Sequence, residues 1–193
     1  YRREKGLLDY DDLLFELEDL LRENALAAEA LRGQFRHILV DEYQDTNLVQ
    51  ARIVRLLTGP EDRMTGNVMA VGDEAQSIYA FRGANVRNIL DFPKLFPGAR
   101  IVRLEENYRS TRPVLDVANS LLAHAAESFR KTLFTRKEGG EPVRLFTPLS
   151  DMSQAALVVR RIRELLQFHL PHEIAVLFRS GFHSYMLEMA LNQ

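Results

Sequence analysis

Cysteine is absent from the 193 residues of this chain. Its absence excludes disulfide bridges and thiolate metal sites, and it is typical of a reducing compartment, so we expect the protein in the cytoplasm. Long apolar runs are also absent, because none approaches the roughly 20 residues that a helix needs to cross a bilayer. The charges nearly cancel, with 25 Lys and Arg against 27 Asp and Glu and a formal net charge of -2. Bulk charge therefore neither indicates nor excludes nucleic acid, and any basic surface must be local.

The two ends of the sequence lack the features of natural termini. The start, YRREKGLLDYDD, has no initiator Met and no apolar signal core, and the end, EMALNQ, stops within a helical pattern. We therefore expect the sequence to be an excerpt of a longer protein. Its 46% hydrophobic and 27% charged residues predict a packed globular core rather than a disordered chain.

Amphipathic patterns at helical spacing recur along the chain. Gly33 is expected to end the first helix, and Asp45 or Thr46 is expected to cap the second. Pro113 stands in the first turn of a later helix, where proline is tolerated. The predicted helices cover 9–31, the segment closed by Thr-Gly-Pro at 58–60, 85–98 with a break at two prolines, 113–122, 151–169 and 182–192.

Short apolar runs between these helices predict strands. They lie at 38–40, 68–71, 100–104, 143–146 and 173–180, and the segment 135–142 is the most linker-like. Strands that alternate with helices indicate an α/β fold with a mainly parallel sheet flanked by helices.

Polar residues follow three of the predicted strands. Asp41 and Glu42 end the first, Gly72 and Asp73 end the second, and residues 105–109 follow the third. Because ligands of open α/β sheets bind outside the carboxyl ends of the strands, we expect these residues to face one cleft.

The pair Asp41-Glu42 has the chemistry of a nucleotide-hydrolysing site. One carboxylate can hold Mg²⁺ directly or through water, and the next can orient and deprotonate an attacking water. Acids also cap the helices that follow strands, and the dipeptide alone favours that structural role.

The segment 71–85, VGDEAQSIYAFRGAN, combines an amide with aromatic and cationic side chains. Gln76 can contact both a terminal phosphate and a water. Aromatic and cationic side chains then follow within four residues, at Tyr79, Phe81 and Arg82. This combination suits a single strand of nucleic acid, because bases can stack on the ring faces and the cation can contact phosphate or stack. The alternative is that the two aromatic residues belong to the core.

The segment EENYRST, residues 105–111, places Arg109 between a predicted strand and a helix. This arginine can reach across a cleft and neutralise charge on a phosphoryl group, and Tyr108 offers a flat face to a nucleobase. The alternative is a surface arginine paired with Glu105 or Glu106.

Taken together, ILVDEYQDTN, VMAVGDEAQSIYAFRGAN and RLEENYRST resemble, in order and spacing, motifs II, III and IV of superfamily 1 DNA helicases of the UvrD/Rep type. GLLDYDDLL upstream and IAVLFRSGFHSYMLEMAL downstream are similar to neighbouring segments of that family. The resemblance implies parts of two RecA-like P-loop NTPase domains. Residues 1–107 would be the C-terminal part of the first, and residues 108–193 would be a hinge with motif IV and the N-terminal part of the second.

The resemblance also implies roles at the nucleotide. Asp41 would hold Mg²⁺, Glu42 would be the base that activates water, and Gln76 would contact the γ-phosphate of ATP. Tyr108 would stack on the adenine, and Arg109 would act as the arginine finger on the γ-phosphate.

For DNA, the resemblance implies that Tyr79, Phe81 and Arg82 line the path of a single strand and couple it to the ATP site. Phe81 stands where the family has a stacking Trp, and Glu74-Ala75 stand where it often has Asp residues. A smaller ring is expected to stack more weakly, and the second change to have little effect.

The activity that the resemblance implies is an ATP-dependent 3′ to 5′ DNA helicase or translocase in DNA repair or replication, with ATP, Mg²⁺, single-stranded DNA and duplex DNA as its ligands. The sequence holds no G-x-x-x-x-G-K-[ST] loop to cradle phosphates. We therefore expect the isolated chain to hydrolyse ATP negligibly.

Two other interpretations remain open from the residues. A metal-dependent nuclease would use Asp41, Glu42, Asp45 and Asp73 as a two-metal cluster. A non-catalytic nucleic-acid-binding or protein interaction module on a degenerate NTPase fold would not depend on Glu42.

Overall fold

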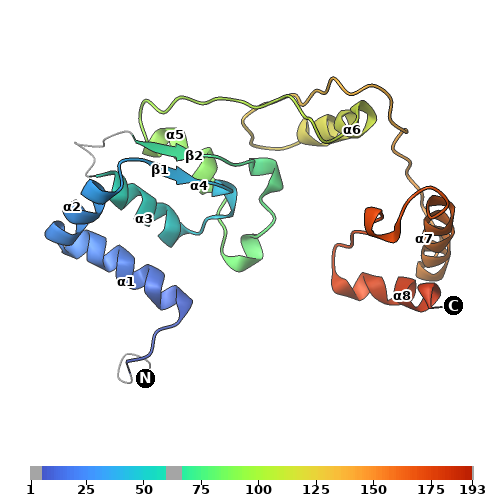
Figure 1. The fold of residues 1–193 in the computed structure, drawn as a ribbon, viewed down its shortest axis with the longest axis horizontal. Coiled ribbons are helices and arrows are strands. Elements are labelled where there is room, and N and C mark those ends of the chain that lie inside the picture. The colour runs from blue at the N-terminus through green and yellow to red at the C-terminus, as the bar shows by residue number, and fades with distance from the viewer. Residues whose placement is uncertain (1–5, 60–66, 193) are drawn as a thin grey trace. The chain divides into compact units, whose positions relative to one another are not determined.

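The computed structural model describes residues 6–59 and 67–192. The chain forms two compact units, Tyr1–Glu141 and Pro142–Gln193 (Figure 1). The sequence EDRMTGN at 61–67 also predicts a loop, and this segment lies almost wholly outside the described residues.

The first unit begins with two helices, α1 (Tyr10–Glu23) and α2 (Ala25–Gln34). Asn24 separates them, because its side-chain oxygen accepts the N–H of Ala27 at 3.0 Å and so caps α2. The prediction of one helix over 9–31 ended by Gly33 is therefore wrong. A side chain that bonds nearby backbone interrupts the helix at Asn24, while Gly33 lies inside the last turn of α2.

Helix α3 (Leu48–Thr58) is capped at its N-terminus by Asn47, which forms a reciprocal capping box with Gln50. The expected cap at Asp45 or Thr46 is corrected accordingly, since Asp45 belongs to a preceding 3-10 turn, Tyr43–Asp45. Helix α3 packs against α1 and α2 (Figure 1). Their shared core is built from Leu21, Ala28 and Ile53, with Leu14, Leu17, Leu31, Val49, Leu56 and Leu57 around them.

The sheet consists of β1 (Ile38–Val40) and β2 (Val68–Ala70), which pair in parallel. Hydrogen bonds continue past both strand ends, from Val71 N–H to the carbonyl of Val40 and from Tyr43 N–H to the carbonyl of Val71. The two carboxyl ends therefore leave the sheet side by side, which brings the residues after each strand together.

A second core lies beside this sheet. Tyr43 is fully buried and packs edge-on against Phe92, with ring centroids 5.4 Å apart. The predicted helix over 85–98 is broken, as expected, into α4 (Arg87–Leu90) and α5 (Phe92–Leu95). Helix α6 (Arg112–Leu122) carries Pro113 in its first turn, also as predicted.

Three predicted strands, at 100–104, 143–146 and 173–180, are not strands in the described part of the chain. Near the first, an isolated parallel bridge joins Glu106 to Phe134. A strand forms only where a neighbour accepts its hydrogen bonds, and the described residues offer these apolar segments none. The mainly parallel sheet is therefore reduced to β1 and β2 in a helix-rich α/β structure.

The second unit packs α7 (Asp151–Leu165) against α8 (Tyr185–Leu191). The buried residues of these two helices are Ala155, Val159 and Leu187. Both helices are shorter than the predicted 151–169 and 182–192. Among the described helices, none combines the length and apolar character that a bilayer crossing requires.

Candidate nucleotide-binding site

Asp41 and Glu42 follow β1 directly, at the carboxyl edge of the sheet. Glu42 has φ 49°, the left-handed region, and among described residues it is the one non-glycine with a positive φ. The Oδ1 atom of Asp41 accepts the N–H of Glu42 at 2.9 Å. Both side chains are exposed. The sharp backbone turn thus places two adjacent carboxylates in solvent at the strand end.

Gln44 joins the ends of the two strands. It is 1% exposed, its Nε2 donates to Oε2 of Glu42 at 2.7 Å, and its Oε1 accepts the N–H of Asp73 at 3.0 Å. Gly72 makes room for this side chain, because a Cβ at position 72 would collide with Oε1 of Gln44. Sequence reasoning missed Gln44. The sequence signal for it is an amide beside the acids of one strand end and a glycine at the other.

Asp73 continues this chain of hydrogen bonds to Gln76. Its Oδ2 accepts Nε2 of Gln76 at 3.0 Å, while Oδ1 accepts the N–H of Ala75 at 3.0 Å and Nζ of Lys131 at 2.5 Å. Burial alone would raise the pKa of Asp73, but the hydrogen bonds from Lys131 and Gln76 outweigh it and lower that pKa. Glu42 and Gln76 are therefore linked through the side chain of Gln44 and through Asp73, which contributes its backbone N–H on one side and its carboxylate on the other.

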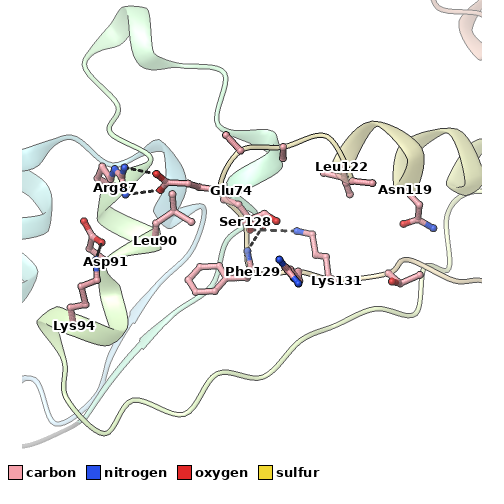
Figure 2. Close-up of a pocket in the computed structure, with 16 residues that line it drawn as sticks. Glu74, Arg87, Leu90, Asp91, Lys94, Asn119, Leu122, Ser128, Phe129 and Lys131 are labelled. Atoms are coloured by element: carbon pink, nitrogen blue, oxygen red, sulfur yellow. Dashed lines mark hydrogen bonds and ion pairs between the residues drawn. The ribbon is translucent and has the colours of Figure 1, made fainter.

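Lys131 and Phe129 lie far along the chain from the two strand ends, and both contact Glu74, which follows the second strand (Figure 2). Nζ of Lys131 also lies 3.6 Å from Oε2 of Glu74, and Oε1 of Glu74 accepts the N–H of Phe129 at 3.1 Å. A cavity of about 700 Å³ opens beside these contacts. It is lined by Glu74 and by residues within the segments 87–94 and 119–132. Sequence reasoning did not single out Lys131, because the contact spans 58 positions.

The carboxylates do not form the two-metal cluster that a nuclease would need. In the described ranges, 6–59 and 67–192, no three His, Asp or Glu side chains gather as metal ligands. Asp73 is engaged by Lys131, and Oδ1 of Asp45 is buried without a hydrogen-bond partner.

Tyr79, Phe81 and Arg82 lie on the surface and not in the core, which removes the alternative drawn from the sequence. The exposed fraction is 37% for Tyr79 and 78% for Phe81. The guanidinium carbon of Arg82 lies 5.1 Å from the first ring centroid and 5.4 Å from the second. The three residues form one exposed aromatic and cationic surface.

Tyr108 is 75% exposed. A hydrogen bond with Glu106 and the charge of that carboxylate raise the pKa of the Tyr108 phenol, so the ring stays neutral at physiological pH.

Arg109 is also exposed, and its backbone N–H donates to Oδ1 of Asn107 at 2.9 Å. Its carbonyl accepts Nζ of Lys137 at 2.9 Å. In the part of the chain that the structure describes, no ion pair joins its guanidinium to Glu105 or Glu106. Nor does any hydrogen bond or ion pair join Arg109 to Asp41, Glu42 or Gln76.

Two family models match nearly the whole chain. The UvrD/REP helicase N-terminal domain matches residues 1–97, and the UvrD-like helicase C-terminal domain matches residues 102–193. The chain belongs to the UvrD/Rep helicase family. The resemblance seen in the motifs is thereby confirmed. The two family models meet between residues 97 and 102, while the compact units meet at 141, and the predicted boundary at 107–108 stays a prediction.

Named relatives within the UvrD/Rep family are similar along the whole chain. DNA helicase II of Escherichia coli is 42% identical over 189 residues, which are 97% of this chain and 26% of that protein. DNA helicase II of Haemophilus influenzae is 39% identical over 187 residues, 96% and 25% of the two chains. ATP-dependent DNA helicase UvrD1 of Mycobacterium tuberculosis is 39% identical over 194 residues, 98% and 25%. The chain thus spans about a quarter of the length of these curated relatives.

Proposed function

We propose that this chain is the part of an ATP-dependent DNA helicase that positions the attacking water and contacts the γ-phosphate. The observation that carries the proposal is the chain of hydrogen bonds from Glu42 through Gln44 and Asp73 to Gln76, at the carboxyl ends of two paired parallel strands. Ligands of RecA-like and other open α/β sheets bind at this edge. The names of the relatives support the same activity.

The donor set fits Mg²⁺. This ion takes oxygen ligands, keeps several waters, and is usually held by one or two carboxylates together with the phosphates of a substrate. Asp41 supplies an exposed carboxylate at the strand end, and Asp73 is engaged elsewhere. Asp41 would therefore hold Mg²⁺, which would offset negative charge on the phosphates.

Glu42 would take the proton of the attacking water, since it is exposed and its Oε2 is oriented by Nε2 of Gln44. Gln76 would accept a hydrogen bond from that water at its amide oxygen, and the N–H of its NH₂ group that does not serve Asp73 would donate to the γ-phosphate.

Arg109 and Tyr108 would complete the site from the second domain. With the domain boundary at 107–108, Arg109 lies at the hinge, where ATP binding would draw it onto the γ-phosphate while Tyr108 stacks on the adenine. Hydrolysis would release the domains, and each cycle would move the bound strand.

The surface formed by Tyr79, Phe81 and Arg82 would bind single-stranded DNA. Stacking of a base on an exposed ring is worth about 1–3 kcal/mol. We further propose movement in the 3′ to 5′ direction, unwinding of duplex DNA in repair or replication, and action in the cytoplasm.

Because the sequence holds no G-x-x-x-x-G-K-[ST] loop, the backbone nest that cradles phosphates must come from elsewhere. We propose that the chain belongs to a longer protein that supplies this loop, and that the 193-residue chain alone hydrolyses ATP negligibly.

Phosphate release by the full-length protein, measured with and without single-stranded DNA, tests the proposal. We expect DNA-stimulated turnover that Glu42→Gln abolishes, and unwinding of a duplex with a 3′ tail in preference to a 5′ tail. An unaffected Glu42→Gln variant would support the non-catalytic module instead. DNA cleavage with Mg²⁺ or Mn²⁺ and no nucleotide would support a nuclease.

A further inference from the structure

We propose that Lys131 is a positioning residue for the nucleotide site: through Asp73 it fixes the orientation of Gln76. In this way the segment 129–133 becomes part of the hydrolysis machinery. The inference rests on the proposed function, and it adds a residue outside all three helicase motifs.

The segment that carries Lys131 is held at both of its ends. At one end, the N–H of Phe129 donates to Glu74, and the Phe129 side chain packs against the core around Tyr43 and Ile89. At the other end, the Asn119 side chain of α6 donates to the carbonyl of Leu133 at 2.8 Å and accepts its N–H at 2.9 Å. Lys131 is thus anchored without belonging to a helix or strand.

The ammonium of Lys131 is placed against two acids and has little access to water. Its side chain is 14% exposed, and it lies 2.5 Å from Oδ1 of Asp73 and 3.6 Å from Oε2 of Glu74. Two other cations that line this cavity have partners of their own, Arg87 with Glu127 and Lys94 with Asp91. Because the ammonium of Lys131 is itself paired with Asp73 and Glu74, we assign Lys131 a role toward Asp73 and not toward a free anion.

The direction of each hydrogen bond explains how this contact reaches Gln76. An ionised carboxylate only accepts hydrogen bonds, so Asp73 requires the NH₂ end of Gln76, and the amide oxygen must face the other way. Lys131 holds the Asp73 carboxylate in place and lowers its pKa. Without Lys131, the carboxylate would lose the ammonium that fixes its position, and the Gln76 amide would lose the fixed acceptor that selects its orientation.

The backbone of Asp73 extends the same control to Glu42. The N–H of Asp73 requires the carbonyl end of Gln44, which leaves the NH₂ end of Gln44 to donate to Glu42. A shift of Asp73 would therefore disturb both groups that are proposed to contact the water.

Steady-state ATP hydrolysis by the full-length protein, with saturating single-stranded DNA, tests the inference. We expect Lys131→Met to lower kcat about 10- to 100-fold, since displacing a catalytic group by about 1 Å costs up to that much, while KM for ATP changes little. Lys131→Arg should keep most of the activity. Lys94→Met is the matched control, because it removes a lysine from the rim of the same cavity, and its kcat should match that of the wild type.

Asp73→Asn and the double variant separate positioning from stability. If Lys131 acts through Asp73, the double variant should be no slower than Asp73→Asn, because the second substitution removes an interaction that is already lost. A Lys131→Met variant with wild-type kcat, or losses that multiply in the double variant, would overturn the inference. So would a loss of kcat that tracks only the fraction of unfolded protein.

The outcomes also distinguish this inference from the proposed function. If the wild type hydrolyses ATP and Glu42→Gln does not, an active Lys131→Met protein refutes the role of Lys131 alone. If Glu42→Gln retains full turnover, the proposed function fails and the inference fails with it.

Discussion

Arg52 on α3 donates two hydrogen bonds to the carboxylate of Glu18 on α1. The distance from Nε to Oε1 is 2.6 Å, and the distance from Nη2 to Oε2 is 3.0 Å. Glu18 is 6% exposed, so this pair fastens the two helices at the edge of their shared core. Arg52→Met should lower the free energy of unfolding by about 2 kcal/mol, because it leaves a buried carboxylate without its partner. Chemical denaturation followed by circular dichroism measures the effect.

Arg22→Met is the control for this prediction, because Arg22 pairs with Asp19 on the exposed face of α1 and such a pair contributes about 0–1 kcal/mol. The double variant Glu18→Met/Arg52→Met should recover part of the loss, since no charge stays buried. Equal effects of Arg52→Met and Arg22→Met would show that the pair does not fasten the helices.

Gly72→Ala should displace Gln44. The new Cβ would collide with Oε1 of Gln44 and lie 2.8 Å from Cδ1 of Ile89. We expect a loss of about 1–3 kcal/mol in stability and a lower kcat for ATP in the full-length protein. Gly33→Ala is the control, because nothing lies within 4 Å of its Cβ and alanine favours the helix by about 0.5–1 kcal/mol. A Gly72→Ala protein as stable and active as wild type would contradict the packing of Gln44.

Arg109→Ala in the full-length protein should lower ATP turnover about 10³-fold or more if the residue acts as a finger arginine. DNA affinity should stay unchanged, because the proposed DNA surface is formed by Tyr79, Phe81 and Arg82 and does not include Arg109. Single-turnover hydrolysis and fluorescence anisotropy with labelled DNA measure the two quantities. A parallel loss of affinity and turnover would argue against the finger role.

Phe81→Ala should weaken the binding of single-stranded DNA by about 1–3 kcal/mol, the value of one stacked base. Phe81→Trp should strengthen it, because a larger ring offers more stacking surface. Phe15→Ala removes an exposed ring from α1 and should leave affinity unchanged. Equal affinities for all four proteins, measured by anisotropy, would exclude this surface as the DNA path.

The lowered pKa of Asp73 predicts a pH-dependent contribution to stability. Such a carboxyl stabilises the fold at every pH above its unfolded pKa of about 3.9, and the contribution is lost as the pH falls through the lower folded value. The difference in unfolding free energy between wild type and Asp73→Asn should therefore be constant from about pH 7 to 5 and shrink below about 4. Urea unfolding across this range measures it. A difference that persists unchanged at pH 3 would contradict the ion pair with Lys131.

Short sequence patterns, such as a proline or an apolar run, correctly predicted some helices and strands. Helix α6 carries Pro113 in its first turn, as the sequence predicted, and β1 has the predicted bounds. Asn24 and Asn47 were missed because several polar residues near each helix start can cap it, and only the folded backbone selects one. The prediction of a strand at 100–104 is wrong, because a strand forms only beside a second strand that accepts its hydrogen bonds, and an apolar pattern does not supply that second strand.

The sequence by itself determined the family and the residues at the strand ends, because their order and spacing are local properties of the chain. Only the tertiary structure decided how those residues are joined. In the sequence, nothing distinguishes Gln44 from the other polar residues beside it. Lys131 lies 58 positions from Asp73, so the sequence alone does not indicate that the two side chains meet. Side chains so far apart in sequence meet only when the backbone has folded, because a hydrogen bond depends on distance and direction in space.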